Sequence, residues 1–127
     1  MDTGISIIKY VRAELLKDKQ LQNMIGDKIF PIIAENDTTY PFITLTNESV
    51  NPEYTKSGCL YDSVDFSAKI VATSYQNMID IAEKVRDILE NKSDNRFTLI
   101  RVSNIGSDDF NDDAYSKEIS FNANFKR

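Results

Sequence analysis

One stretch in the middle of the chain passes directly from a strand pattern into a helix pattern. Apolar and polar side chains alternate from Val64 to Ala72, which is typical of a strand with one buried face. From Tyr75 to Leu89, apolar residues recur at three- and four-residue spacing, which predicts one apolar stripe on a helix. The stripe consists of Tyr75, Met78, Ile79, Ala82, Val85, Ile88 and Leu89. Because strand and helix are so close in sequence, we expect their apolar faces to pack against each other and form the core.

Both ends of this helix have sequence signals. Thr73 and Gln76 have the spacing of a capping box, in which the threonine hydroxyl accepts a hydrogen bond from an amide of the first turn. The polar run 91–95 predicts that the helix ends near Asn91.

The N-terminal part predicts a helix followed by a short helical turn. One apolar face of a helix from Thr3 to Asp18 is formed by Ile5, Ile8, Val11 and Leu15. A further turn of helix ends at Gly26, which we expect to adopt a left-handed conformation.

Two strands are expected before the central stretch, over 28–33 and 40–46. Pro31 has no backbone N–H to donate to a neighbouring strand, so the first of them should lie at a sheet edge. Between 47 and 61 the alternation is lost, and Asn-Pro and Ser-Gly pairs predict a long connection.

The last third of the chain predicts two strands that pair with each other. Over 115–125, one face carries Tyr115, Ile119, Phe121, Ala123 and Phe125. We expect this strand to pair antiparallel with a strand over 97–102, in which Phe97 and Leu99 share one face. An acidic loop over 105–113 would connect them.

These elements define the expected fold class. The order helix, three strands, helix, two strands predicts a single α+β domain over residues 1–127. Its mainly antiparallel sheet would have about five strands, with two helices packed on one face.

Composition narrows the function classes. The chain has a net charge of −5 and no histidine. Binding of nucleic acid through phosphate neutralisation needs clustered Lys and Arg, and histidine is the commonest general base and metal ligand. No apolar run approaches the ~20 residues that a membrane span needs. We therefore expect no catalytic site, no cofactor, no bound metal, no specific nucleic-acid binding and no membrane insertion.

The only cysteine is Cys59, so no disulfide can form within the chain, and a reducing compartment fits. Without a histidine to activate its thiol, we interpret Cys59 as a small, partly buried residue rather than a nucleophile.

The acidic loop is the strongest local chemical signal, with carboxylates at Asp108, Asp109, Asp112 and Asp113. Oxygen-rich clusters hold Ca²⁺ or Mg²⁺ in many proteins. This loop lacks the turn glycine and the distant bidentate Glu of a calcium loop, so a solvated turn between strands is the simpler interpretation.

The long connection over 47–61 is a candidate subunit interface. It carries Tyr54, Lys56, Leu60 and Tyr61, and aromatic side chains are favoured at interfaces. A flexible flap, or an extension of a hairpin, are the alternatives.

Five short motifs occur in a characteristic order along nearly the whole chain. They are MIGDKIFP at 24–31, YPFI at 40–43, PEYT at 52–55, ATSY at 72–75 and YSKEISF at 115–121. In these motifs and in its element order, the chain resembles the tail-completion, or tail-terminator, proteins of long-tailed double-stranded DNA phages and related prophages.

The resemblance implies a structural virion protein without catalysis. Such proteins form a ring, commonly of about six subunits, that caps the finished tail tube and docks to the head. The expected partners are further copies of the chain, the tail tube protein and a head-completion or connector protein. The expected location is the head-proximal end of the tail, and the host cytoplasm before assembly. If the four aspartates of the acidic loop faced the enclosed channel, they would repel passing DNA.

Two alternatives stay open at this point. A head-completion or connector protein has a similar size and α+β character. A small acidic binding module that inhibits a host protein by occupying its DNA-binding surface belongs to a different class, and it should be a monomer or dimer rather than a ring.

Overall fold

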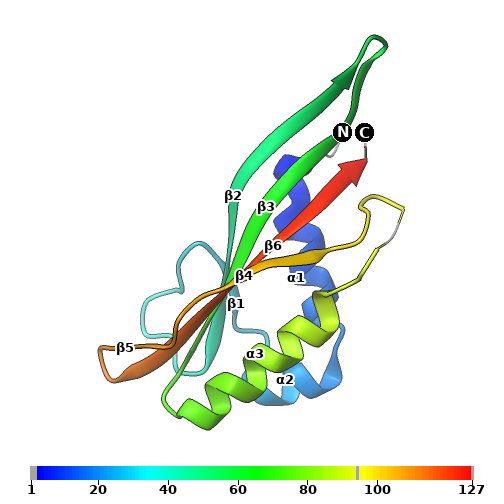
Figure 1. Cartoon of the computed structure of the whole chain (residues 1–127). Helices are drawn as coiled ribbons and strands as arrows, with labels where there is room; N and C mark the ends of the chain where they lie inside the picture. Colours follow the sequence, from blue (N-terminus) through cyan, green and yellow to red (C-terminus); the bar gives the residue numbers. More distant parts are fainter. Residues whose placement is uncertain (1–2, 94, 127) are drawn as a thin grey trace.

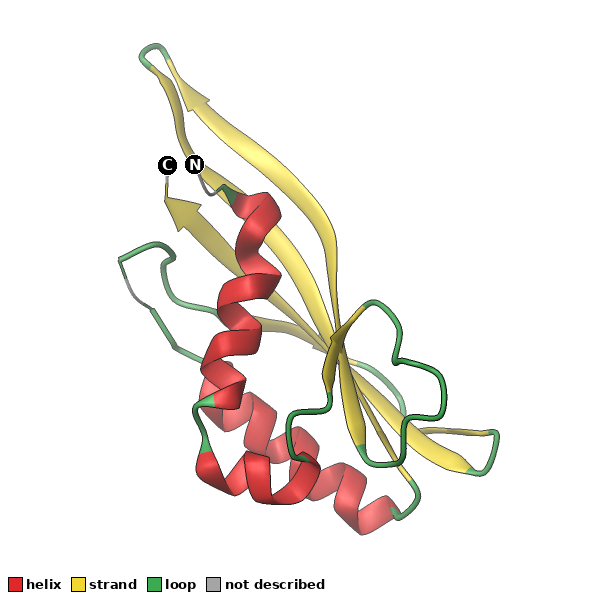
Figure 2. Cartoon of the chain, turned by 180° about the vertical axis from the view of Figure 1, so that it is seen from behind, coloured by secondary structure: helices red, strands yellow, loops and turns green. Residues whose placement is uncertain are grey.

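A twisted sheet lies against a layer of helices in the computed structural model, which describes residues 3–93 and 95–126 (Figure 1). In chain order the elements are η1 (Gly4–Ser6), α1 (Ile7–Leu16), α2 (Lys19–Ile25), β1 (Ile29–Pro31), β2 (Phe42–Thr55), β3 (Gly58–Ala72), α3 (Tyr75–Leu89), β4 (Arg101–Ile105), β5 (Asp109–Asn111) and β6 (Ala114–Lys126). The strand order is β1-β2-β3-β6-β4, and β5 also pairs with β6. Figure 2 shows the helices gathered on one side of the sheet. The predicted α+β class is confirmed, and the described residues form a 6-stranded sheet.

The central strand has the predicted alternation. Its inward-facing residues are all fully buried, namely Val64, Phe66, Ala68, Ile70 and Ala72. On the neighbouring strand β6, Phe121 stacks on Phe66 with ring centroids 5.2 Å apart. Because β3 lies between β2 and β6, its apolar face forms the middle of the core.

Helix α3 packs on this face as expected, but its cap and part of its stripe differ from the prediction. The N-cap is Ser74, whose Oγ accepts a hydrogen bond from the Asn77 N–H at 3.4 Å. The predicted Thr73–Gln76 capping box is wrong, since the Gln76 amide donates to Asp80 one turn further on (2.9 Å). The buried stripe consists of Met78, Ile81, Ala82, Val85 and Leu89. Tyr75, the first residue of the helix, is 46% exposed, and its ring lies against Tyr115 of β6.

The N-terminal helix begins with a 3-10 turn, which changes the predicted buried face. Ile7 is fully buried, whereas Ile5 is 76% exposed and Ile8 is half-buried. Since a 3-10 turn rotates faster per residue than an α-helix, positions before and after η1 do not share one α-helical stripe. The end of α2 at Gly26 agrees with the prediction, and the φ of this glycine is positive, +67°, but its ψ of −132° lies outside the predicted left-handed helical region.

The predicted long connection over 47–61 is wrong, and the alternative of an extended hairpin is confirmed, because β2 and β3 continue as a long antiparallel hairpin. Pairing runs to Thr55 and Gly58, which are joined by a two-residue turn. Register shifts at Asn47/Ser49 and at Glu53/Tyr54 interrupt the pairing. Each such irregularity inserts a residue and breaks the period of two, so the sequence pattern of a strand is lost here. The backbone of Cys59 is part of β3, but its side chain lies outside the described part of the chain.

The predicted strand over 97–102 is largely wrong as well. Phe97 forms only an isolated bridge to Phe125, and the regular strand β4 begins at Arg101. Phe97 and Ile100 are both buried, whereas Leu99 is 45% exposed, so the residues do not alternate as in a strand. The predicted antiparallel pairing with the last strand is confirmed for β4.

The sheet edges differ in length. β1 is short, pairs parallel with β2 over Ile29–Pro31, and lies at the edge as predicted from Pro31. At the opposite edge, β4 and β5 both pair with β6. Among the described residues, no helix is long and apolar enough to cross a membrane.

Candidate functional site

The far end of the β2–β3 hairpin projects beyond the ends of the helices (Figure 1). We call residues 47–63 the hairpin arm. Of the residues predicted as an interface, Tyr54 is 71% exposed, Leu60 is 55% exposed, Lys56 is exposed and Tyr61 is half-buried. The structure therefore brings these four residues together on one projecting hairpin.

One backbone edge of the arm is uncovered. β1 pairs with β2 only as far as Leu45, and no other described strand lies along β2 beyond that point. The base of the arm is anchored to the N-terminal turn, because the Asn47 amide donates to the Gly4 carbonyl at 3.2 Å. An uncovered strand edge offers N–H and C=O groups that pair readily with another chain.

The predicted acidic loop contains a second, shorter hairpin. β5 pairs with the start of β6, and Asp112 and Asp113 form the two-residue turn between them. Both turn residues have positive φ, 51° and 62°. The carboxylates of Asp108, Asp109, Asp112 and Asp113 all belong to exposed residues. We call residues 108–116 the acidic hairpin.

Asp108 is engaged within the subunit, unlike the other three aspartates as far as the described contacts show. The Lys117 ammonium donates to its carboxylate at 2.7 Å, and the Tyr75 hydroxyl donates at 2.9 Å. The hydrogen bond from Lys117, followed by that from Tyr75, lowers the pKa of Asp108. The same bond to Asp108 raises the pKa of Tyr75, because it stabilises the protonated hydroxyl. These contacts fix the acidic hairpin to the start of α3.

An exposed aromatic residue at the acidic hairpin had no role in the sequence analysis. Phe110 lies in the middle of β5 and is 56% exposed. Its ring centroid is 4.7 Å from that of Tyr115, which contacts Tyr75 in turn at 5.8 Å. Its exposure could have been predicted from the sequence, because an aromatic residue among four carboxylates is seldom part of a core.

A third surface at the β1–β2 edge was also missed. Ile32 and Ile33, directly after β1, are 73% and 76% exposed. A groove of about 230 Å³ beside them is lined by Ile32, Ile33, Ala34, Phe42, Thr44, Lys69 and Val71. We call it the edge groove. In the sequence, the groove is indicated only by the two isoleucines after Pro31. They are not recognised as exposed there, because the segment over 28–33 is interpreted as a strand.

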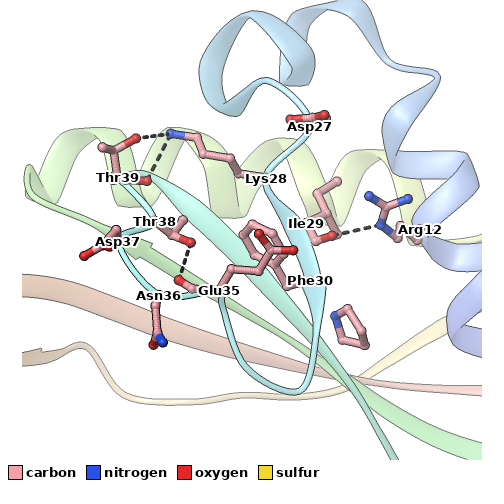
Figure 3. A pocket seen from close by; sticks show the side chains of 11 residues that line it. Arg12, Asp27, Lys28, Ile29, Phe30, Glu35, Asn36, Asp37, Thr38 and Thr39 are labelled. Carbon is pink, nitrogen blue, oxygen red and sulfur yellow. Dashed lines mark hydrogen bonds between the residues drawn. The ribbon is translucent and has the colours of Figure 1, made fainter.

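A larger cleft of about 590 Å³ lies between β1 and the loop over residues 35–39 (Figure 3). Its two cations are engaged with backbone carbonyls, since Arg12 donates to Ile29 at 2.8 Å and Lys28 donates to Thr39 at 3.0 Å. Three carboxylates, from Asp27, Glu35 and Asp37, share the lining. The bond from Arg12 joins α1 to β1, and the bond from Lys28 joins the segment before β1 to the loop. The mixed charges of the cleft select no one ligand class. In the part of the chain that the structure describes, no group of three His, Cys, Asp or Glu side chains is placed to hold a metal ion.

An uncovered strand edge and exposed apolar side chains on separate surfaces are typical of a protein that assembles with other proteins. The comparisons with known proteins agree. The chain belongs to the tail completion protein gp17 family, whose model matches residues 9–124. It is therefore a structural protein of the phage tail.

Solved structures show the same fold. A chain of the virion of a native gene transfer agent particle has a TM-score of 0.78 and 18% sequence identity, with 92% of each chain covered. A second solved chain has a TM-score of 0.60 and 11% identity, with 96% of each covered. Among curated proteins, none matches this chain significantly.

Proposed function

We propose that this protein caps the finished tail tube and forms a ring of about six subunits that joins the tail to the head. Its partners are neighbouring copies of itself, the tail tube protein and the head-completion or connector protein. It acts at the head-proximal end of the tail. The proposal builds on the family to which the chain belongs and on the surfaces described above.

The hairpin arm is the observation that carries this proposal. A closed ring needs a heterologous interface, in which each subunit presents two different surfaces. The arm supplies one of them, because Tyr54 and Leu60 are exposed near the end of a long hairpin. Leaving two large apolar side chains in water on a projecting arm is unfavourable for a monomer, and burial in an assembly removes that exposure.

The absolute mass of the purified protein tests the proposal. Light scattering over a wide concentration range, with particle images of the largest species, should show a closed ring. The same measurement with isolated tail tubes covers the case in which assembly needs a template. A protein that stays monomeric alone and does not bind tail tubes would rule out the proposed role.

Variants of the hairpin arm test whether the arm is needed for ring formation. The double variant Tyr54→Ser/Leu60→Ser should reduce ring formation, because it removes the exposed apolar side chains of the arm. Met24→Ser is the matched control, since Met24 is also an exposed apolar residue (39%) but lies on α2. Equal loss of ring in both variants would contradict a specific role of the arm.

A further inference from the structure

We propose that the Phe110 side chain of one subunit inserts into the edge groove of the next subunit. The inference rests on the ring proposed above, and it names two surfaces that join neighbouring subunits. Each subunit carries one edge groove and one Phe110, so the same contact can repeat around the ring.

The edge groove has an exposed apolar rim. Ile32 and Ile33 are adjacent in sequence, and each leaves about three quarters of its surface in solvent, 73% and 76%. Half-buried Phe42 and Val71 continue the apolar lining. Contiguous apolar surface of this kind on a folded domain marks a contact with another molecule.

The backbone under this rim is strained. Ile32 has a φ of +65°, a region that β-branched residues rarely adopt. Its N–H donates to the Leu45 carbonyl at 2.8 Å, so the neighbouring strand holds this conformation. Because the Ile32 side chain is exposed, its burial within the subunit does not offset the strain. Burial of this side chain against a neighbouring subunit would offset the strain.

Phe110 is exposed and held in place at the same time. Its ring rests on Tyr115, and the segment before it is tied down by the bond between Lys117 and Asp108. A side chain that is already ordered before binding loses little entropy on insertion into a groove.

Charge favours a second copy of this chain as the occupant. Lys69 lines the edge groove. On the other surface, the turn that follows β5 exposes the carboxylates of Asp112 and Asp113. An aromatic side chain followed by two carboxylates complements an apolar groove with a cation at its side.

The two surfaces lie apart on one subunit. Ile32 and Ile33 follow β1, and β2, β3 and β6 separate β1 from β5. At about 4.8 Å between neighbouring strands, the rim is roughly 19 Å from β5. The inner side of the groove, at Lys69 and Val71, is on β3, two strands from β5. Within the subunit the Phe110 ring rests on Tyr115. In the proposed contact the hairpin of one subunit fills the groove of another, and such pairing is heterologous.

Site-directed disulfide formation tests the contact. In a Cys59→Ser background, Ile33→Cys and Phe110→Cys are made as separate variants, mixed in equal amounts and oxidised. We expect a covalent dimer in the mixture and little in either variant alone, because the contact joins two different surfaces. In the matched control, Glu83→Cys on the exposed face of α3 replaces Phe110→Cys and should yield no dimer with Ile33→Cys.

Charge reversal provides a second measurement that does not depend on cysteines. Lys69→Glu should weaken self-association about tenfold, as should Asp112→Lys combined with Asp113→Lys. Mixing the two oppositely reversed proteins should restore association, because each supplies the charge that the other needs. Circular dichroism checks that these exposed substitutions leave the fold intact.

The outcomes separate this contact from the ring itself. If the protein forms particles of ring mass but the mixture gives no cross-link and charge reversal has no effect, the Phe110 contact is wrong and the ring remains. The acidic hairpin would then be available to face the channel. If the protein stays monomeric both alone and with tail tubes, the contact and the ring are both wrong.

Discussion

The backbone N–H of Gly4 donates a hydrogen bond of 2.8 Å to the carboxylate of Asp62, 58 positions later in the chain. Both residues are buried, so the bond joins the N-terminal turn to β3 at the base of the hairpin arm. The contact is close because Gly4 has no side chain. A Cβ on this residue would lie 2.7 Å from the Asp62 Cβ and from a methyl group of Val64.

Gly4→Ala should therefore destabilise the protein. We expect a loss of about 1–3 kcal/mol in the free energy of unfolding, since the added methyl group forces η1 away from β3. Urea denaturation measures the change. Gly26→Ala is an informative comparison, because nothing lies within 4 Å of the added Cβ there and only the positive φ is unfavourable. An unchanged stability of Gly4→Ala would mean that η1 is not packed on Asp62.

Substitutions in the turn of the acidic hairpin should stabilise the protein. Asp112 and Asp113 both have positive φ, and Asn-Gly suits such a two-residue turn better than Asp-Asp. We expect Asp112→Asn/Asp113→Gly to raise the free energy of unfolding by about 0.5–1 kcal/mol. The matched control is Lys56→Asn/Ser57→Gly in the turn of the hairpin arm, where neither residue has positive φ, and it should give no gain.

The pKa of Asp108 should depend more strongly on Lys117 than on Tyr75. Lys117→Met should raise the pKa of Asp108 most, and Tyr75→Phe should raise it less, because the bond from Lys117 is the larger cause of the lowered value. An NMR pH titration of the Asp108 carboxyl group measures both variants. A larger effect of Tyr75→Phe would contradict this assignment.

The pKa values of Asp108 and Tyr75 predict how the stability of the acidic hairpin changes with pH. A lowered pKa in the folded state means that Asp108 contributes stability above its ordinary pKa, and this contribution is lost as the pH falls through the lowered value. The raised pKa of Tyr75 works in the opposite direction, so its contribution is present below its ordinary pKa and is lost at higher alkaline pH. We expect the protection factors of the β5 amides, which correct for the intrinsic pH dependence of exchange, to be largest between these limits. In the Lys117→Met variant, the loss of this stability at acidic pH should be smaller, because the pKa of Asp108 is then less lowered.

Ile32 allows stability and assembly to be separated. Ile32→Gly should raise the free energy of unfolding by about 1 kcal/mol, because glycine adopts positive φ without strain. The same variant should weaken self-association, since it removes part of the apolar rim. Ile33→Gly is the matched control with almost the same exposure but without positive φ, and it should weaken self-association with no gain in stability. Thermal unfolding and light scattering on the same samples check both parts.

Much of the fold could be predicted from the sequence where an element buries one face. The apolar residues of β3 and β6 recur every second position because each strand has the helices on one side only, and α3 shows the corresponding helical period. The same argument fails for the hairpin arm. There, neither face is covered by helices along most of its length, and the irregular pairing near Asn47 and Tyr54 shifts the alternation.

The candidate site was predicted less completely. The composition of the segment over 47–61 predicts an interface that includes Tyr54, Lys56, Leu60 and Tyr61, and the structure places these residues on one projecting hairpin. The sequence gives no such indication for Phe110, Ile32 and Ile33, since an apolar residue in a sequence is most simply interpreted as part of a core. Their exposure follows from their place at the two edges of the sheet, where no helix or strand among the described residues covers them.

The α+β class, the central strand and helix, and the family to which the protein belongs can be read from its residues alone, because these depend on local periodicity and short motifs. The length of β2 and β3, the identity of the edge strands, and the apolar side chains that remain in solvent become known only from the folded chain. These properties depend on contacts between residues far apart in the chain, such as Gly4 with Asp62, and a local pattern does not record them.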